Sequence, residues 1–458
     1  MDLIAATLLV LSLLATVTYA RRRIGGRMSL SLLLFASLMT IHCVPMLVYV
    51  YVTGPDTVIF ETALSGLADQ EGTLAKMMFA VSLMFVCLML GSEAGLVVAP
   101  RWRRAAKKAF SAQRPGELAR ILRIDAPGRL LLWVLVLAML AVSLDQSHLS
   151  RVIDFFNFSG TEIEKTQLRA ELGGTPYYAY NVLLYSVAPF LVMVSWANDG
   201  RRTGNWRPSL LTFALFSLVL LGKFGTLSKA PPVIFLLQLL LMRALLRGDQ
   251  LNVRLILQFV VAGVLLFATM VRLTFPELDL SGVGAFLYYR VFDIPNEVLL
   301  EYFAAVPASI PHTWGRAGLA AMGLASPGDS LQTYFAVAEV TRGSILSSSN
   351  VMFIGDAWAQ FAWPGVAVTS ALMAFTVRLI DLHAQAAGRS DLSSCLTAGG
   401  AFGIVTCLST AFTTALITGG LAILPFLAAA FVERRRPSTE RSEPGTATHA
   451  VAHTPAPQ

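Results

Sequence analysis

Long apolar stretches separated by short polar segments form the main pattern of this chain. About eleven such stretches, each of about 15 to 25 residues, follow one another between residues 2 and 432. An α-helix of about 20 residues crosses the roughly 30 Å of hydrocarbon in a bilayer and satisfies its own backbone hydrogen bonds there. The pattern therefore predicts an all-α polytopic membrane protein with about 11 transmembrane helices.

The composition agrees with this prediction, because only 14% of the residues are charged, against roughly 25% in soluble domains. The predicted transmembrane domain covers residues 1–436, and the tail 437–458, rich in Ser, Thr and Pro, is predicted to be disordered. The individual spans are predicted at about 2–20, 28–52, 75–98, 130–144, 177–197, 209–221, 231–246, 255–271, 359–380, 396–414 and 416–432.

The basic residues give the predicted orientation. Runs of Arg and Lys follow the first and third spans, at 21–27 and 101–123, whereas the loop 53–72 contains neither. Because cytoplasmic loops carry an excess of Lys and Arg, the N-terminus is predicted outside, the C-terminus in the cytoplasm, and the loops 145–176 and 273–357 outside. These runs account for the net charge of +7, so membrane lipids are expected as partners and nucleic acid is not.

A few cations lie on the predicted external side and run against this charge pattern. The segment 273–357 holds eight acidic residues and three basic ones. Each exception to the pattern needs a structural or functional reason. The exceptions are Arg290, Arg316 and Arg342 in that segment, Arg151, Lys165 and Arg169 in the loop 145–176, and Lys223 and Lys229 between the sixth and seventh spans.

Three of these cations have a structural interpretation as well as a functional one. A T-x-x-E capping box at 161–164 predicts a short helix on which Arg169 and Lys165 share a face with Glu162. An ion pair within that helix would explain them without any function. Lys229 directly precedes two prolines near the external mouth of the bundle, where a lysine can extend its amine to the membrane surface.

The segment after the eighth span contains two amphipathic runs separated by Pro295, and Asp293 is placed to cap the second run. Arg290 and Asp293 begin a polar stripe beside an aromatic surface that includes Tyr288 and Tyr289. One interpretation is an interfacial aromatic belt in which Arg290 pairs with Asp293. The other is a platform at the outer membrane surface, where the tyrosines stack on sugar rings and cations bind an anionic lipid headgroup.

Other candidates lie further along the same segment. His312 has no partner at metal-ligand spacing and is compatible with an ordinary loop histidine, while Trp358 and Trp363 are typical of an aromatic belt. His312 and Asp356, like Asp293 and Glu297, are candidates for accepting the proton of an attacking hydroxyl. Neither a metal site nor a cofactor is predicted.

Four stretches occur in an order that is typical of one family. They are TEIEKTQLRAELGGTPYYAYNVLLYSVAPF (161–190), GTLSKAPPVIFLL (225–237), YYRVFDIPNEVLLEYFAAVP (288–307) and SNVMFIGDAWAQFAWPGVAV (349–368), and they span about the central half of the chain. Their order resembles the O-antigen polymerase family, the membrane-bound polymerases of oligosaccharide repeat units in bacterial surface polysaccharide pathways.

The resemblance implies a location in the bacterial cytoplasmic (inner) membrane and a metal-independent glycosyltransferase. Its reaction would join repeat units carried on undecaprenyl pyrophosphate into O-antigen, capsule or exopolysaccharide. A chain-length regulator and a flippase would be further partners. The residues most similar to the family's functional basic residues are Arg169, Lys229 and Arg290. We expect catalytic roles for Arg290, Arg169 and Asp293, and substrate binding by Lys229, Arg342, Tyr288, Tyr289, His312 and Asp356.

The chemistry of such a transfer agrees with the cations. Glycosyl transfer from a lipid pyrophosphate builds negative charge on the leaving group, and fixed cations in a water-poor pocket stabilise that charge. Two alternatives stay open. An O-antigen ligase would share the large external loop but transfer finished chain to another acceptor, and a transporter or flippase would move the same lipid-linked units without joining them.

Overall fold

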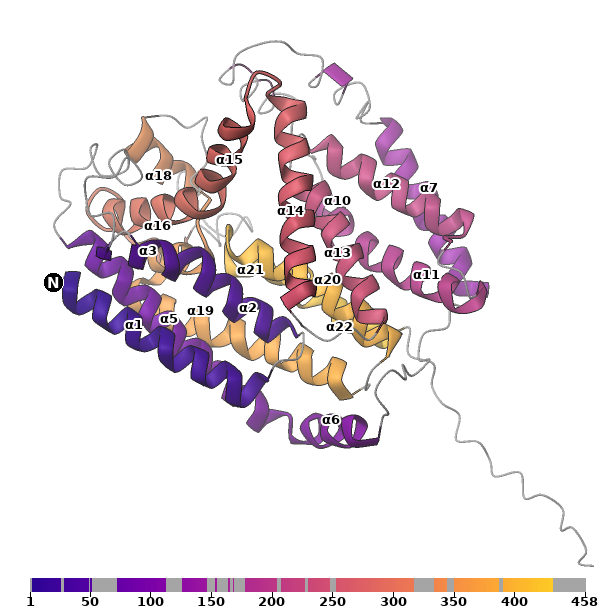
Figure 1. Cartoon of the computed structure of the whole chain (residues 1–458), viewed down its shortest axis with the longest axis horizontal. Helices are drawn as coiled ribbons and strands as arrows, with labels where there is room; N and C mark the ends of the chain where they lie inside the picture. Colours follow the sequence, from indigo (N-terminus) through magenta and orange to yellow (C-terminus); the bar gives the residue numbers. More distant parts are fainter. Residues whose placement is uncertain are drawn as a thin grey trace, which may run out of the picture.

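The computed structural model describes most of the chain as a bundle of helices (Figure 1). The described residues are 2–25, 29–48, 50–51, 72–112, 126–145, 153–154, 164, 168, 178–203, 207–226, 230–247, 253–316, 333–343, 350–386 and 390–430. Arg169, Lys229 and the predicted tail 437–458 lie outside them. Within the described residues every secondary-structure element is a helix, which confirms the all-α prediction.

Five helical stretches are long and apolar enough to cross a membrane. The first two are Leu3–Ile24, which includes most of α1 (Asp2–Tyr19), and Leu30–Val48, which contains α2 (Leu30–Leu38) and α3 (Val44–Val48). The third is α5 (Thr73–Val98). The fourth is Tyr178–Gly200, which contains α10 (Tyr178–Val182) and most of α11 (Ala188–Thr203), and the fifth is α19 (Phe353–Ala386). Four shorter apolar helices coincide with the predicted spans between them: α7 (Ala126–Asp145), α12 (Leu210–Gly225), α13 (Ala230–Leu246) and α14 (Val253–Thr274). The chain is therefore a membrane-embedded protein, and the total of eleven spans stays a prediction.

The last part of the described chain differs from the two predicted spans 396–414 and 416–432. It forms α20 (Asp391–Cys407), α21 (Phe412–Ile417) and α22 (Ile423–Ala430), joined by two turns. The second turn needs glycine, because Gly420 has a φ of 81° and a Cβ at Gly419 would overlap the carbonyl oxygen of Ala415. Hydropathy alone does not distinguish such a turn from a continuous span.

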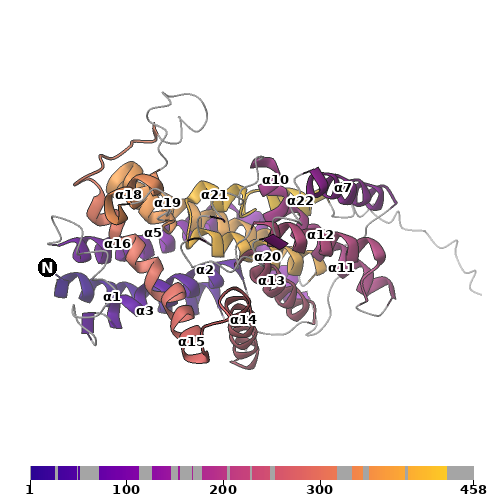
Figure 2. The same ribbon diagram turned by 90° about the horizontal axis from the view of Figure 1, so that it is seen from above.

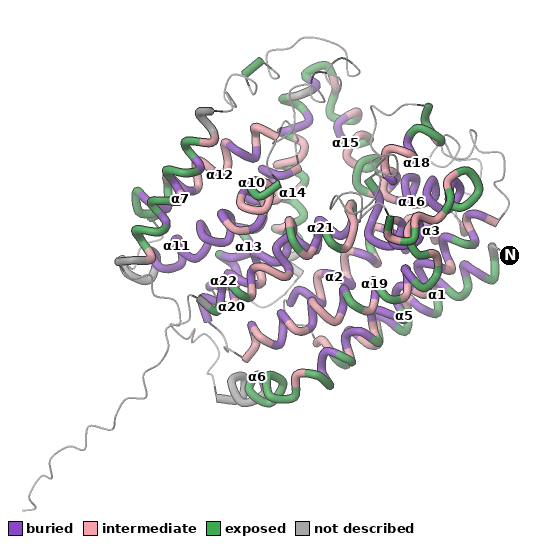
Figure 3. The backbone as a smooth tube through the Cα atoms, turned by 180° about the vertical axis from the view of Figure 1, so that it is seen from behind, coloured by how far each residue is buried: buried purple, intermediate pink, exposed green. Residues whose placement is uncertain are grey.

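The helices form two groups with α20 between them. Figures 1 and 2 place α1, α5 and α19 in one group and α7, α11 and α12 in the other. α20 packs against α2 and α19 on one side and against α11 and α13 on the other. Leucine and valine residues of α7 and α14 are exposed, and Figure 3 colours parts of both helices as exposed. A lipid-facing surface has this apolar character.

α5 packs against α19 through two glycines of α5. A Cβ at Gly91 would overlap the carbonyl oxygen of Ala371, and one at Gly95 would lie 3.1 Å from Cβ of Arg378. Small residues four apart let two backbones approach closely, which strengthens van der Waals contact where lipid offers no hydrophobic driving force. The α5–α19 pair therefore depends on the absence of side chains at these positions.

A buried carboxylate connects α19 to α2. Both carboxylate oxygens of Asp381 accept hydrogen bonds, from the backbone N–H groups of Leu30 and Ser31, each at 2.8 Å. These two groups begin α2 and have no partner within the helix. A carboxylate at a helix N-terminus also interacts favourably with the helix dipole, so Asp381 fixes the start of α2 against α19.

Basic residues gather at one end of the first helix group. Arg23 lies 3.4 Å from the Glu93 carboxylate, and Arg378 donates to the backbone carbonyl of Arg23 at 3.3 Å. The adjoining basic helix α6 (Pro100–Ala112) places Trp102 against His383, with ring centroids 5.3 Å apart. This is the end that the charge pattern predicts to be cytoplasmic.

Gly91→Ala is expected to destabilise the protein by about 1–3 kcal/mol, because the added methyl group forces α5 and α19 apart. Thermal unfolding in detergent measures this as a lower melting temperature. Gly284→Ala is the matched control, since a Cβ at that helical position meets nothing within 4 Å and replacing such a glycine stabilises a helix by about 0.5–1 kcal/mol. Equal melting temperatures for the two variants would show that the α5–α19 contact does not limit stability.

Candidate functional site

The candidate site is built on one helical run from Leu280 to Ala305. It consists of α15 (Leu280–Tyr288), a π-helical turn, η5 (Tyr289–Asp293), and α16 (Ile294–Ala305). Asp279 caps the run by accepting from the backbone N–H of Gly282 at 2.7 Å. The prediction that Asp293 caps a second helix is wrong: its backbone is helical and its side chain makes no capping bond. The helix continues through η5 instead of starting again.

Burial divides this run into two parts. All residues from Asn296 to Ala305 are buried, whereas α15 and η5 are mostly exposed. The polar stripe predicted from the sequence therefore faces the protein, because Asp293, Glu297 and Glu301 are only 5%, 5% and 1% exposed. Tyr288 and Tyr289, at 50% and 43%, are exposed instead.

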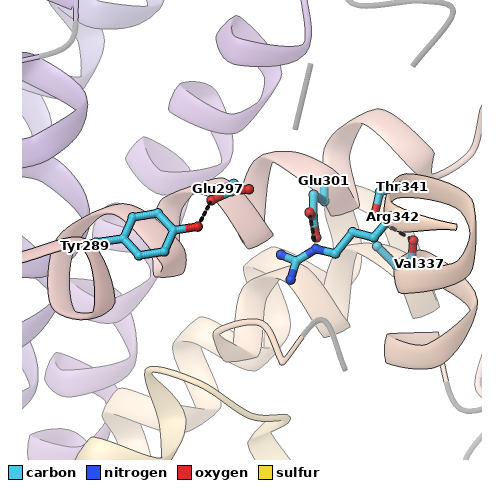
Figure 4. A network of polar contacts seen from close by, with 6 residues as sticks. All are labelled: Tyr289, Glu297, Glu301, Val337, Thr341 and Arg342. Atoms are coloured by element: carbon cyan, nitrogen blue, oxygen red, sulfur yellow. Dashed lines mark hydrogen bonds and ion pairs between the residues drawn. The ribbon is translucent and has the colours of Figure 1, made fainter. Parts of the chain in front are cut away.

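Arg342 is paired with one of the buried carboxylates. It ends α18 (Thr333–Arg342), and its Nε donates to Oε1 of Glu301 at 2.8 Å (Figure 4). Although burial alone would lower the pKa of Arg342, the hydrogen bond and charge of Glu301 outweigh it and raise that pKa. Arg342 thus joins α18 to α16 and supplies a positive charge next to the row of carboxylates.

Glu297 is the carboxylate that a neighbouring hydroxyl contacts. The Tyr289 hydroxyl donates to Oε2 of Glu297 at 3.3 Å (Figure 4). Burial raises the pKa of Glu297, against the opposing effects of Arg342 and of the Tyr289 hydrogen bond, and burial likewise raises the pKa of Asp293. A carboxylate whose pKa is raised is a stronger base toward the proton of a neighbouring hydroxyl.

Arg290 is exposed and lies on the same turn as Tyr289. Its guanidinium carbon lies 5.2 Å from the ring centroid of Phe286, within cation–π range. No ion pair or hydrogen bond joins Arg290 to Asp293, both of which the structure describes. The predicted ion pair between Arg290 and Asp293 is therefore not formed, and the Arg290 side chain is exposed.

The start of α19 packs against α16 through Trp358. Its ring stacks on Phe303 with centroids 4.9 Å apart, and its Nε1 donates to the carbonyl oxygen of Val306 at 3.0 Å. Trp358 is 5% exposed, so it is a core residue and not a residue of an aromatic belt. His312 Nδ1 donates to the Trp358 carbonyl oxygen at 3.0 Å, which fixes His312 on the same helix.

α19 breaks two residues before Pro364. Phe361 and Ala362 have non-helical backbone angles, and Ala362 has a φ of 53°. Proline provides no N–H for the helix and disfavours helical geometry before it. The carbonyl groups of Ala359 and Gln360 instead accept from the backbone N–H groups of Thr313 and Trp314, at 3.2 and 2.8 Å.

The structure brings some of the predicted site residues together and separates others. Asp293 directly precedes α16, Tyr289 and Arg342 contact its glutamates, and Asp356 is close enough to act electrostatically on Tyr302 of that helix. His312 reaches the same region through Trp358. Tyr288 and Arg290 belong to the exposed part of the run. Arg169 and Lys229 lie outside the described residues.

Two buried polar residues were not among the predicted site residues. His42, in a π-helical turn of the second span (η2, Met39–Cys43), donates from Nδ1 to Oδ1 of Asn296 at 3.1 Å, and the Asn296 amide donates to the carbonyl oxygen of Ile41. Lys223, assigned from sequence to a connection, is fully buried in α12. An ionisable residue within or beside an apolar span was the available signal in both cases.

Comparison with known proteins gives no assignment. No protein-family model, no curated protein and no solved structure matches the chain. The described residues define the class as an all-α, membrane-embedded protein with a buried row of carboxylates at one end. Its function is therefore inferred from this geometry and from the resemblance of the four sequence stretches.

Arg342→Met is expected to lower the free energy of unfolding by about 1–2 kcal/mol, because Glu301 loses a charge-assisted hydrogen bond. Partial exposure of Arg342 to water in the wild type limits the size of this loss. The Arg342 side chain is 33% exposed and that of Glu301 is 1% exposed. Chemical or thermal unfolding in detergent measures the loss.

Arg316→Met, at an exposed arginine, is the control and should leave stability unchanged. Adding Glu301→Gln to Arg342→Met should cost less than the sum of the two single changes, because both remove the same interaction. Additive losses would mean that the pair does not contribute through its mutual contact.

Proposed function

We propose that this protein polymerises oligosaccharide repeat units carried on undecaprenyl pyrophosphate, at the external face of the bacterial cytoplasmic membrane. The product would be O-antigen, capsule or exopolysaccharide. The resemblance of the four stretches to O-antigen polymerases supplies the substrate class. The arrangement around η5 supplies the chemistry, and it is the observation that carries the proposal.

That observation is an exposed cation beside buried carboxylates on one continuous helical run. Arg290 and the exposed rings of Tyr288 and Tyr289 face outward, and Glu297 lies beneath the Tyr289 hydroxyl. An exposed arginine suits a phosphate group, which it can bind with two parallel hydrogen bonds. Tyrosine rings offer apolar faces for a sugar. The run thus supports recognition of a phosphate and a glycan at neighbouring positions.

The proposed reaction requires charge stabilisation and proton removal. When the bond between the donor sugar and the pyrophosphate breaks, negative charge develops on the departing pyrophosphate. Arg290 stabilises this developing charge. The attacking hydroxyl of the acceptor loses its proton to a carboxylate, and Glu297 is the best-placed candidate because burial raises its pKa. Asp293, one turn earlier, is the second candidate.

Tyr289→Phe is expected to move the acid limb of the activity profile to higher pH, because the variant lacks the hydroxyl that stabilises the ionised Glu297 carboxylate. The Tyr289 hydrogen bond lowers the pKa of Glu297, so its removal raises that pKa further. Because the base must be ionised, activity is lost as pH falls through the raised pKa. Polymer formation by purified protein across a pH series measures the limb.

Tyr288→Phe is the matched control for this shift. Tyr288 is exposed next to Tyr289 and packs against Phe292 with ring centroids 5.4 Å apart. Its hydroxyl is not bonded to Glu297, so the acid limb should stay in place. If the acid limb of Tyr289→Phe lies at the same pH as that of wild type, Glu297 is not the base. Glu297→Gln should then retain activity.

Arg290→Ala is expected to reduce chain extension at least a hundredfold while the protein remains in the membrane, because removing one stabilising group at a developing oxyanion costs about 10²–10³ in rate. The assay supplies purified protein with lipid-linked repeat units and separates the products by gel. Arg316→Ala, another exposed arginine of the predicted external segment, should keep normal extension. Full-length polymer from Arg290→Ala would exclude the phosphate contact.

Gene deletion distinguishes the proposed polymerase from a ligase, and a transport assay distinguishes it from a transporter. Loss of the ladder of long chains, with single repeat units remaining, is expected for a polymerase. Finished polymer that stays on its lipid carrier would indicate a ligase. Purified protein that moves lipid-linked units across a vesicle membrane without joining them would indicate a transporter.

A further inference from the structure

Lys223 is a fully buried lysine without a hydrogen-bond acceptor. It lies in the last turn of α12 and is 0% exposed, and its Nζ has no partner. Three aromatic rings surround the amine, with Nζ to centroid distances of 4.6 Å to Tyr185, 5.0 Å to Phe402 and 5.8 Å to Phe235. We call Lys223 and these three rings the lysine cage.

The lysine cage is assembled from four separate elements. Tyr185 comes from the π-helical turn η4 (Leu183–Val187), Phe235 from α13 and Phe402 from α20, while Lys223 itself comes from α12. The Tyr185 and Phe402 rings are stacked, with an interplanar angle of 9° and centroids 5.6 Å apart. The lysine amine therefore lies where four helical elements meet, in contact with the ring faces.

The rings alone do not satisfy the amine. Ring faces attract a cation, but they provide no oxygen to accept its N–H groups, and burial of an ammonium without a counter-ion is strongly unfavourable. Within the described part of the chain, no carboxylate forms an ion pair with Lys223. A methionine would fill the same space without this penalty, so packing alone does not explain a lysine at this position.

The surroundings of Lys223 favour a phosphate over other anions. The Thr226 hydroxyl lies at the same end of α12, where it donates to the backbone carbonyl oxygen of Lys223 at 2.7 Å. This end is opposite the end where Ser209 caps α12 and binds Asp199 of α11, and the charge pattern predicts it to be external. Membrane lipids present phosphate groups at the depth of a helix end, and a lysine is a suitable point charge for them.

We propose that Lys223 is the cation of a phosphate-binding site at this end of α12, for the phosphate or diphosphate group of a membrane lipid. The flexible four-carbon side chain lets the amine turn from the ring faces toward the lipid surface, while the rings bind the side-chain stem. The site does not require the transferase reaction, so it can fail or hold independently of the proposed function.

The test uses purified protein in a phosphate-free maltoside detergent and two matched pairs of probes. Farnesyl diphosphate is compared with farnesol, and dioctanoyl phosphatidylglycerol with dioctanoylglycerol. Wild-type protein should bind at least one phosphate probe tenfold more tightly than its phosphate-free partner in equilibrium titrations. Lys223→Met should lose this preference, and Lys223→Arg should keep most of it.

Lys76→Met is the matched control, because Lys76 is exposed near the start of α5, at the end that is also predicted to be external. It should keep the full tenfold preference. The preferred pair identifies the source: farnesyl diphosphate indicates a polyprenyl carrier, and phosphatidylglycerol indicates a headgroup.

Melting without ligand gives a second readout of the same site. Lys223→Met should melt above wild type, because the unpartnered buried amine is removed. A lower melting temperature would make Lys223 a structural residue and overturn the proposal. Equal phosphate preference in wild type and Lys223→Met, for both probe pairs, would overturn it as well.

Discussion

The close approach of α5 and α19 is the contact on which the rest of the described structure depends. In lipid, helices gain little from the hydrophobic effect, so van der Waals contact between backbones must hold them together. Gly91 and Gly95 permit that contact. α5 also packs against α1 and α16, and α19 against α2, α16 and α20. The position of the candidate site, between α16 and the start of α19, follows from this pair.

Three irregular backbone segments adjoin the candidate site. A π-helical turn precedes α16, another carries His42 beside it, and α19 breaks at Phe361 and Ala362. Non-helical backbone is tolerated at membrane depth only where other groups satisfy its N–H and carbonyl groups. Here the Asn296 amide accepts from His42 and donates to Ile41, and the loop at Thr313 donates to α19. Such turns are frequent at functional sites, which agrees with the location inferred from the carboxylates.

Much of the fold could be predicted from the sequence, because the period and length of apolar stretches follow directly from bilayer thickness. The first nine spans match helices within a few residues. The G-x-x-x-G spacing of Gly91 and Gly95 was a further signal of close helix packing that hydropathy does not use. The burial of α16 could not be predicted, since its glutamates have the spacing of a solvated stripe and only the partners Tyr289 and Arg342 make their burial possible. The site prediction based on cations was therefore incomplete: it left out the carboxylate that pairs with Arg342.

The two proposed phosphate contacts, Arg290 and Lys223, have different electrostatic surroundings. Around α16, three buried carboxylates face one partly buried arginine, and burial raises the pKa of Asp293 and Glu297. A phosphate would be repelled from that row, so it must bind on the exposed side of η5, where Arg290 lies. Lys223 has the opposite surroundings, since aromatic rings attract its charge without neutralising it. Arg290 can therefore exchange ligands rapidly with water, whereas an anion at Lys223 must replace the ring contacts that the amine makes when the site is empty.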